Sequence, residues 1–485
     1  MKKNQKANAA TGLLLGLALV ATACGGNGNN NEASPSASDS AGASPSASAS
    51  SSASASAAPT QAPDVTLTVQ YPTADNPVWV SVADDQIKRF SEKFPNVTIK
   101  KNTWQYNPNE IGVKMAAHQA PSFFQTAATE GRTLVEHSWA ADLTPYLEGY
   151  AQLDQINKSL LEPFTFDGKI YALPSDAYMM TVTLNKKLFE AKNVAIPSPD
   201  WTWNEFYEAA KATADPAKGI AGFAIMAKGN EGGWQWTNLL YQAGGEAQKV
   251  EGGKVVSTFN SDAGVKAMDF LKKLRWEANA LPQNWALNYG DTYNLFKQGR
   301  AAIVLGNAVE DAVNNGGMNK DDLVVLPMPA AEAGGEHVGI MGGNFFIVNP
   351  QETPDVQKAA FDYITNDYFT DSGVESLRMD LESRKSKNQI RVPNVANYYT
   401  QDSEYGKKMQ AVYDAYPETV YKYDDRVYEL AKGKTEPSYN GQDYYAALTN
   451  VMQEVLTDKN ADVKKLLDAA ATKFDSDFLS KITLE

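Results

Sequence analysis

The sequence has very little cysteine and histidine. Its 485 residues include one cysteine, Cys24, and three histidines, His118, His137 and His337. One cysteine excludes a disulfide within the chain and any metal site built on several thiolates. The chain also lacks the HExxH, Walker, G-x-S-x-G and G-x-G-x-x-G patterns of common metal, phosphate, hydrolase and dinucleotide chemistry. We therefore expect no metal ion, no cofactor, no catalytic residue and no enzymatic activity.

Positive charge is also scarce. The formal net charge is −14 and the isoelectric point is about 4.9. A nucleic-acid partner needs a cationic face that neutralises its phosphates. The charge balance therefore argues against nucleic acid as a partner.

Long hydrophobic runs are absent except near the N-terminus. Three lysines precede the apolar run Leu13–Ala23, which is shorter than the ~20 residues that cross a bilayer and is typical of an export signal. The run ends just before Cys24 in small residues, which resembles the lipid-attachment motif of bacterial lipoproteins, with Ala21 where those proteins usually have leucine. We predict a signal peptide over residues 1–23 and a lipidated Cys24. The alternative is an ordinary secretory signal followed by an incidental cysteine.

Bulky apolar residues are nearly absent from the next segment, in which Asn, Gly, Ser, Ala and Pro dominate. Residues 24–63 cannot bury enough surface to offset chain entropy, so we expect a disordered tether with a reach of roughly 35 Å. Lipid chains on Cys24, such as palmitate, would anchor it to the outer face of the cell membrane, as in a Gram-positive bacterium.

The rest of the chain contains enough apolar material for more than one core, since 43% of all residues are hydrophobic. Val65–Tyr71 alternates like a strand, Val82–Phe94 has helical spacing, and Val97–Ile99 is the next strand, which indicates an α/β sheet. Ligands of such sheets bind beyond the carboxyl ends of the strands. Tyr71 and Trp104 are therefore candidate ligand contacts, with a place at the edge of the core as the alternative.

The stretch Phe166–Phe189 is the predicted crossing between two lobes. Asp167-Gly168 is a strong turn signal. Ile170–Leu173 is a short apolar strand, and after a proline break Tyr178–Leu184 is a second, β-branched one. The crossing would lie at the break and would be a place for a ligand contact and a hinge together.

The segment after the crossing contains a capped helix and two tryptophans close together. Thr202 and Glu205 form a capping box that starts a helix. The segment Glu231–Trp236 is predicted as a glycine-flanked loop, whose indoles, Trp234 and Trp236, are costly to expose unless something stacks on them. Further predicted elements are helices at 111–119, 237–242 and 356–368, a helix with a core stripe after 259–262, strands at 121–127, 219–227, 323–328 and 342–348, a helix end and strand at 296–305, a second crossing at 329–337, and a mainly helical chain from 371 onward.

Six motifs, in this order, resemble the sugar-binding family of extracellular solute-binding proteins of ABC importers, the family that includes maltose-binding protein. The motifs are FDGKIYALP (166–174), LNKKLF (184–189), TWNEF (202–206), FNSDAGVKAMDFL (259–271), FKQGRAAIVLGN (296–307) and GGNFFIV (342–348). This chain departs from the family at Leu184, where the family has tyrosine, and at Asn307-Ala308, where many members have a tryptophan.

The resemblance implies an α/β, periplasmic-binding-protein-like fold of two lobes with a hinged interlobe cleft. The implied lobes are residues 64–177 plus 338–375 and residues 178–337 plus 376–485. It also implies ligand contacts on cleft-facing loops, at Glu130, Tyr178, Trp234 and Tyr444.

The expected chemistry of this cleft is sugar recognition, in which aromatic faces cover the ring and planar polar groups pair with its hydroxyls. The candidate ligand-binding residues are Tyr71, Trp104, Glu130, Asp176, Tyr178, Trp234, Trp236, Asn307, Asn344 and Tyr444.

We therefore expect a lipid-anchored extracellular monomer that captures a carbohydrate, in particular an oligosaccharide, and delivers it to the permease subunits of an ABC transporter. One alternative keeps the transport role with a non-sugar ligand. The other is a tethered carbohydrate-active enzyme, because a glycosidase needs only two carboxylates.

Overall fold

The structure is a computed structural model that describes residues 63–74 and 77–483. The predicted signal peptide, Cys24 and all but the last residue of the predicted tether lie outside the described residues. Within the described ranges, no helix combines the length and the apolar character needed to cross a membrane.

The first sheet has five strands in the order β2-β1-β3-β15-β6. β1 is parallel to β2 and β3, whereas β15 is antiparallel to β3 and β6. The strands are β1 (Val65–Gln70), β2 (Val97–Asn102), β3 (Phe123–Ala127), β6 (Ala172–Pro174) and β15 (Asn344–Val348). Alternation in β1 buries Leu67 and Val69 completely, as expected for a strand covered on one face. The main helices around this sheet are α1 (Pro77–Lys93), α2 (Ile111–Ala116), α3 (Gly131–Glu136), α4 (Thr144–Leu147) and α11 (Pro354–Thr365).

The second sheet has four strands in the order β13-β8-β12-β9, with β12 parallel to β9 and β8 antiparallel to both β12 and β13. The strands are β8 (Thr181–Asn185), β9 (Ala221–Ala224), β12 (Ala301–Leu305) and β13 (Leu323–Pro327). Every residue of β8, β9 and β12 is buried, which explains their continuous apolar or small-residue sequences. The nearby helices are α5 (Lys186–Glu190), α6 (Trp203–Thr213), α7 (Glu231–Gln242), α8 (Asp262–Trp276), α9 (Tyr289–Lys297) and α10 (Val309–Asn314).

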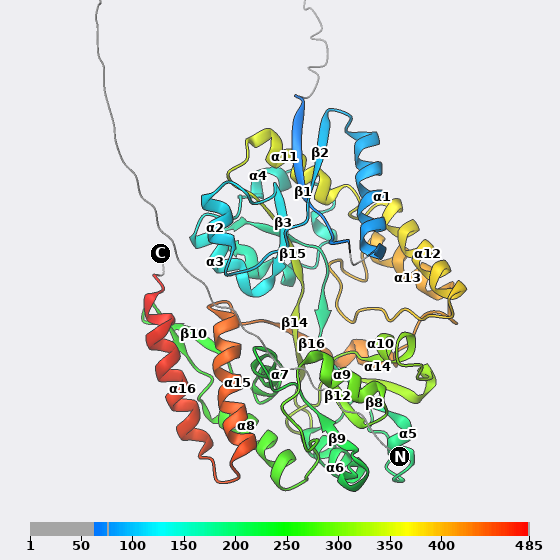
Figure 1. Cartoon of the computed structure of the whole chain (residues 1–485), viewed down its shortest axis with the longest axis vertical. Coiled ribbons are helices and arrows are strands. Elements are labelled where there is room, and N and C mark those ends of the chain that lie inside the picture. The colour runs from blue at the N-terminus through cyan, green and yellow to red at the C-terminus, as the bar shows by residue number, and fades with distance from the viewer. Residues whose placement is uncertain (1–62, 75–76, 484–485) are drawn as a thin grey trace, which may run out of the picture. The chain divides into compact units, whose positions relative to one another are not determined.

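A third sheet, in the order β16-β14-β7, lies between the other two (Figure 1). Its strands are β7 (Tyr178–Met179), β14 (His337–Gly342) and β16 (Ala431–Thr435). The chain passes from β6 of the first sheet through β7 into β8 of the second, and it returns from β14 into β15. The single strand predicted for 178–184 is therefore two strands in different sheets. The return crossing uses β14 and not the predicted segment 329–337.

Local signals near the first crossing are confirmed. Asp167 and Gly168 have φ angles of 50° and 75° and join the two-residue strands β4 (Thr165–Phe166) and β5 (Lys169–Ile170) in a tight hairpin. The capping box is also present, since Thr202 accepts from the backbone of Glu205 while the Glu205 carboxylate accepts from the backbone of Thr202.

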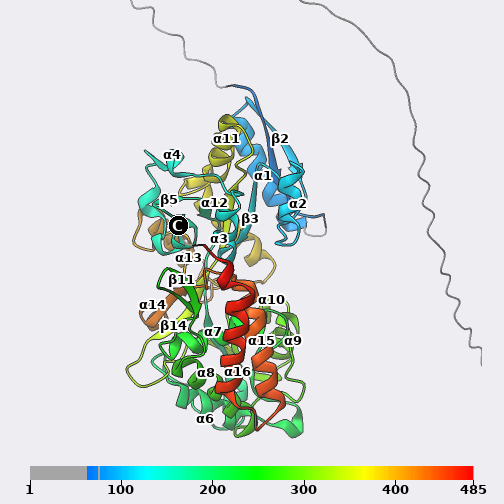
Figure 2. The same cartoon turned by 90° about the vertical axis from the view of Figure 1, so that its left-hand side faces the viewer.

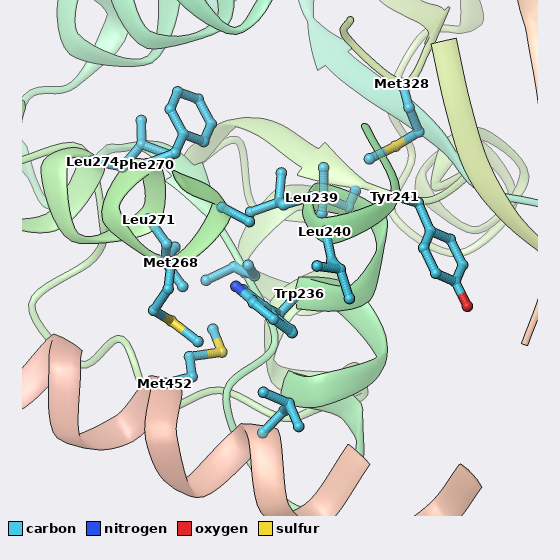
Figure 3. Packing of buried hydrophobic residues seen from close by; sticks show 14 of the residues in the cluster. Trp236, Leu239, Leu240, Tyr241, Met268, Phe270, Leu271, Leu274, Met328 and Met452 are labelled. Carbon is cyan, nitrogen blue, oxygen red and sulfur yellow. The ribbon is translucent and has the colours of Figure 1, made fainter. Parts of the chain in front are cut away.

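The segment Glu231–Trp236 is not a loop, as predicted, but the first part of helix α7. Its glycines serve helix packing: a Cβ on Gly233 would lie 2.1 Å from the carbonyl oxygen of Tyr445 on α15 (Gly441–Thr457). Contact this close requires a residue without a side chain. The core that results contains α7, α8 and α15, and Figure 3 shows Trp236 among Met268 and Met452 within it.

The C-terminal part of the chain contributes to both cores. Tyr399 and Tyr405 belong to the core of the first sheet, whereas α15 and α16 (Val463–Asp477), which lie side by side (Figures 1 and 2), belong to that of the second. The other elements are β10 (Gln248–Glu251), β11 (Lys254–Ser257), α12 (Asp371–Ser386), α13 (Glu404–Asp414) and α14 (Asp425–Leu430). This packing favours a more interleaved division than the predicted lobe boundaries, which stay a prediction.

Candidate functional site

Three candidate residues follow strands whose carboxyl ends meet at one edge of the first sheet. Tyr71 follows β1, Trp104 follows β2, and Glu130 ends the short 3-10 turn after β3. Because these strands are parallel, the loops gather where ligands of open α/β sheets bind.

Trp104 and Glu130 belong to one contact network. The Tyr106 hydroxyl donates to the Glu130 carboxylate across 2.6 Å, and its ring lies 6.2 Å from the ring of Trp104. Burial raises the pKa of Glu130, and the neighbouring Asp443 raises it further, while the Tyr106 bond opposes this. Glu130 is therefore a desolvated carboxyl group beside a half-buried indole.

Tyr71 faces different surroundings. Its hydroxyl donates to Asp84 across 2.8 Å, and the ammonium of Lys101 lies 4.3 Å from the centre of its ring. The side chain is 9% exposed. Its polar end is thus engaged with α1 and β2, so Tyr71 is a weaker ligand candidate than Trp104.

Tyr178 and Trp234 meet at the edge of the second sheet. Trp234 lies on the first turn of α7, which follows β9, and Tyr178 is in β7, just before β8. The Trp234 indole N–H donates to the Tyr178 hydroxyl across 3.3 Å, and the rings are edge to face at 6.1 Å. Both side chains are partly exposed, so they form an aromatic pair with one polar edge.

Asn307 follows β12 at this same edge, where the Gly306 amide donates to Thr181. The Asn307 side chain is exposed and donates to the Tyr423 hydroxyl across 2.6 Å. This bond fixes the amide, and its carbonyl oxygen accepts from the backbone of Val309. Asn307 is thus held in place at the end of a central strand.

Asp176 and Asn344 join the two crossings directly. The Asp176 carboxylate accepts from the backbone N–H and the side-chain amide of Asn344, both across 2.9 Å. The preceding glycines allow this approach: a Cβ on Gly343 would lie 2.3 Å from the Asp176 carbonyl oxygen, and one on Gly342 would lie 2.8 Å from the Tyr178 hydroxyl. The Gly-Gly-Asn motif is therefore explained by contact between the crossings.

Gln442 bridges the edges of the two sheets. Its amide donates to the Thr129 hydroxyl across 3.1 Å, and its carbonyl oxygen accepts from Asn230, which precedes α7, across 2.9 Å. Next to this bridge, the Arg132 guanidinium lies 4.6 Å from the ring centre of Tyr439. The edge that carries Glu130 therefore faces the edge that carries Trp234.

Two predicted contacts are wrong. Trp236 and Tyr444 are fully buried in the core of the second sheet, where Tyr444 contacts Phe259 and Phe474 (Figure 3 shows Trp236). Trp236 is buried because the helical periodicity of α7 places it on the opposite side of the helix from Trp234. Side chains without exposed surface cannot stack on a ligand.

Three residues that the sequence analysis missed lie at the same edges: Gln442, Tyr289 and Glu436. Tyr289 begins α9, is 53% exposed, and its N–H donates to Glu231, one helical turn before Trp234, across 2.7 Å. Glu436 follows β16 and accepts from the Tyr445 hydroxyl across 3.0 Å. Glu436 could not be predicted because β16, the strand before it, was not expected. Tyr289 could have been predicted at the start of a helix, because Asn288 just before it is a favoured N-cap residue.

The arrangement combines partly exposed aromatic faces with fixed carboxylate and amide groups. Within residues 63–74 and 77–483, no group of three or more His, Cys, Asp or Glu side chains is placed to hold a metal ion. Two hollows of about 330 and 200 Å³ lie elsewhere, one beside Tyr146 and Phe361 and one beside Tyr399 and Tyr428. The facing edges therefore offer the chemistry of non-covalent ligand binding.

Curated relatives match only part of the chain. A polygalacturonan/rhamnogalacturonan-binding protein of Bacillus subtilis, YtcQ, is 29% identical over 181 residues, which covers 36% of this chain and 35% of that protein. The match thus spans about a third of the relative's length.

Solved structures match nearly the whole body. An ABC substrate-binding protein of Listeria monocytogenes in complex with cycloalternan, Lmo0181, has a TM-score of 0.65 at 19% identity, covering 85% of this chain and 99% of that one. The UgpB protein of Mycobacterium tuberculosis in complex with glycerophosphocholine has a TM-score of 0.62 at 14% identity, covering 86% and 98%. At these identities the likeness shows the fold, and it confirms the predicted α/β, two-lobe class.

The family profile described as bacterial extracellular solute-binding protein matches residues 72–367, more than half of the chain. This match confirms the resemblance predicted from the six ordered motifs. The chain belongs to the bacterial extracellular solute-binding proteins.

Proposed function

We propose that this protein captures a carbohydrate, in particular an oligosaccharide, between the facing edges of its two main sheets and delivers it to the permease subunits of an ABC transporter. The observation that carries the proposal is the Gln442 bridge, which brings the Glu130 edge opposite the Trp234 edge. Residues from both edges can then close on one ligand, in the manner of a hinged two-lobe binding protein.

The side chains at these edges suit a sugar. Trp104, Tyr178 and Trp234 offer partly exposed aromatic faces for the C–H side of a pyranose ring. Glu130, Asp176 and the asparagines offer oxygen and amide groups for hydroxyls, since the polar groups of a bound sugar must be paired once water is excluded. Tyr71 is retained as a peripheral contact. The proposed ligand contacts are therefore Tyr71, Trp104, Glu130, Asp176, Tyr178, Trp234, Asn307 and Asn344.

The charge of the edges favours a neutral sugar over a uronic acid. The charge of Asp443 acts on Glu130 and raises its pKa, and Asp176 lies at the crossing. The nearby cation Arg132 is already paired with Glu136 across 2.6 Å. A ligand carboxylate would meet like charges, which disfavour its binding. The proposed ligand therefore differs in charge from the polyuronides named for YtcQ.

The proposed protein is anchored to the membrane through its N-terminal segment. The sequence before the body supplies an export signal, Cys24 for lipid attachment and a tether of about 35 Å reach. A monomer held in this way at the outer face of the membrane stays close to its permease. Labelling of Cys24 with a palmitate analogue in cells, abolished by Cys24→Ser, would test this part.

Ligand binding is tested with the purified protein and a panel of glucose, maltose, maltotriose, cellobiose, raffinose, galacturonate and glycerophosphocholine. A ligand at 100 times its dissociation constant should raise the unfolding free energy by about 2.7 kcal/mol, which calorimetry and thermal shift detect. A response to glycerophosphocholine alone would support a non-sugar transport ligand. Release of shorter products from an oligosaccharide would support the tethered enzyme. Either result, or no response to any sugar, would overturn the proposed role in carbohydrate transport.

A further inference from the structure

Glu436 lies where the third sheet meets the proposed ligand site. It follows β16 directly, and β16 pairs with β14, whose last residue, Gly342, lies opposite Tyr178. A Cβ on Gly342 would lie 2.8 Å from both the Glu436 carboxylate and the Tyr178 hydroxyl. The absence of a side chain at Gly342 therefore lets this carboxylate and this hydroxyl meet.

Two tyrosine hydroxyls lie next to the Glu436 carboxylate. Tyr445 of α15 donates to it across 3.0 Å, and the Tyr178 hydroxyl of β7 lies beside it, since one Cβ at Gly342 would touch both groups. Tyr178 in turn accepts from the Trp234 indole N–H across 3.3 Å. Two hydrogen bonds, Tyr445 to Glu436 and Trp234 to Tyr178, thus meet where Glu436 and Tyr178 lie side by side at Gly342.

The contact between Glu436 and Tyr178 depends on the ionisation of Glu436. An ionised carboxylate only accepts, so the neighbouring Tyr178 hydroxyl can only donate to it and keeps its oxygen lone pairs for the Trp234 N–H. A protonated carboxyl can donate to Tyr178 and compete with Trp234 for the same oxygen. Ionised Glu436 thus favours the observed geometry of the aromatic pair.

We propose that Glu436 is a positioning residue of the carbohydrate site, which holds Tyr178 and through it Trp234 in the orientation that receives the ligand. This inference rests on the proposed function, because the aromatic pair is part of the proposed sugar contact. Glu436 belongs to none of the motifs that carry the family resemblance.

Glu436 should change its ionisation near neutral pH. Burial raises the pKa of Glu436 to about 7, against the opposing effect of the neighbouring Tyr445 and Tyr178 hydroxyls. The titratable groups around it are Tyr178, Tyr445 and Tyr241 of α7, whose hydroxyl donates to the Thr435 carbonyl, while Lys434 lies over the Tyr241 ring and pairs with Glu246. Among the described residues, no lysine or arginine pairs with Glu436.

A bound sugar should favour the ionised form. The carboxylate has more lone pairs than its two tyrosine neighbours can use, and sugar hydroxyls are donors. The complex should therefore have a lower Glu436 pKa than the free protein, and affinity should rise with pH through about 7.

The test compares wild type, Glu436→Gln and Glu246→Gln at about pH 6, 7 and 8. Titration calorimetry uses the sugar of the panel that binds wild type most tightly, and Trp fluorescence of the sugar-free protein gives a second measurement. We expect wild type to bind about ten-fold more tightly at the highest pH than at the lowest. Glu436→Gln should show no such dependence and bind about ten-fold more weakly at the highest pH, with Glu246→Gln like wild type.

The fluorescence measurement separates the two hypotheses. A fluorescence midpoint near pH 7 that is present in wild type and Glu246→Gln and absent in Glu436→Gln supports the positioning role even if no sugar of the panel binds, a result that would overturn only the proposed function. Sugar binding with the same affinity and pH profile in wild type and Glu436→Gln would overturn the positioning role alone. A fluorescence midpoint shared by all three proteins would also overturn it.

Discussion

Asp176 and Asn344 connect the two strands that cross between the main sheets. Two hydrogen bonds of 2.9 Å join the carboxylate of Asp176 to the backbone and side-chain amides of Asn344. A third contact runs the other way, since the Ser175 amide donates to the Asn344 carbonyl across 2.8 Å. The crossings are thus joined at the point where a hinge would bend, so a change here should alter ligand capture more than folding.

Asp176→Ala removes both carboxylate bonds in an exposed place. We expect the unfolding free energy to fall by about 1 kcal/mol and sugar affinity to fall about ten-fold, because a loose crossing no longer presents Tyr178 and Asn344 together. Calorimetric titration and urea unfolding measure the two effects. Asp424→Ala, which removes the exposed cap of α14, is the matched control and should reduce stability with affinity unchanged. Equal affinity in both variants would give Asp176 a purely structural role.

Trp234 and Trp236 should respond to mutation in opposite ways. Trp236→Ala should lower the unfolding free energy by about 3–5 kcal/mol, since it empties a fully buried site, and leave the affinity of the folded protein unchanged. Trp234→Ala should weaken sugar binding and cost less stability. Denaturant unfolding followed by titration of the folded fraction checks both, and a larger affinity loss in the Trp236 variant would contradict the site assignment.

Gln442→Ala should weaken the contact between the facing edges. Loss of two hydrogen bonds of about 1 kcal/mol each should shift the sugar-free protein toward more open forms and weaken binding about five-fold or more. Small-angle X-ray scattering reports the opening as a larger radius of gyration. Gln453→Ala, on the same helix, is the control. It removes a hydrogen bond to the Ala227 carbonyl on the side of the second sheet, does not touch the bridge, and should leave the radius of gyration unchanged. Identical scattering from both variants would argue against the bridge.

Local patterns predicted the elements of the fold well where each pattern had one cause. The strand at Val65, the Asp167-Gly168 turn and the Thr202 capping box follow from alternation, positive φ and reciprocal capping. The prediction of a loop at Glu231–Trp236 was wrong. Its glycines suggested a turn, whereas in the structure they permit close contact between α7 and α15. Such a contact joins residues about 210 positions apart, which no local window contains.

The candidate site was predicted only in part for a related reason. Trp104 was predicted from the end of its strand, and Glu130, Tyr178 and Trp234 from the family resemblance; their role as ligand contacts stays a prediction. Glu436 depends on the pairing of β16 with β14, a parallel match between distant segments that the sequence does not display. Side-chain direction within a helix also could not be read while α7 was interpreted as a loop, so Trp236 was assigned to the wrong side.

Tyr289 offers an exposed ring near the end of β12, since it packs edge to face on Tyr293, whose hydroxyl donates to the Leu305 carbonyl. Tyr289→Ala should weaken sugar binding by about 0.5–1.5 kcal/mol through lost stacking, whereas Tyr289→Phe should retain most of the affinity. Titration calorimetry distinguishes the two variants. A loss in Tyr289→Phe equal to that in Tyr289→Ala would assign the effect to the hydroxyl and not to the ring.

Glu130 should make stability depend on pH. Burial raises its pKa above the ordinary 4.5, so the unfolded chain loses this proton at lower pH than the folded protein. The folded state therefore bears no penalty from Glu130 below about pH 4.5 and an increasing one as pH rises through its raised pKa. Glu130→Gln keeps an acceptor for Tyr106 without the charge. It should unfold at the same temperature as wild type near pH 4 and at a higher one near pH 8.

Asp443→Asn sharpens this test, because Asp443 contributes to the raised pKa of Glu130 through charge repulsion. Its removal should reproduce part of the stabilisation at high pH and little of it at low pH. The double variant should gain less than the sum of the single gains, since both changes relieve the same repulsion. Fully additive gains in melting temperature, or a Glu130→Gln gain of equal size at both pH values, would contradict a desolvated Glu130 that Asp443 repels.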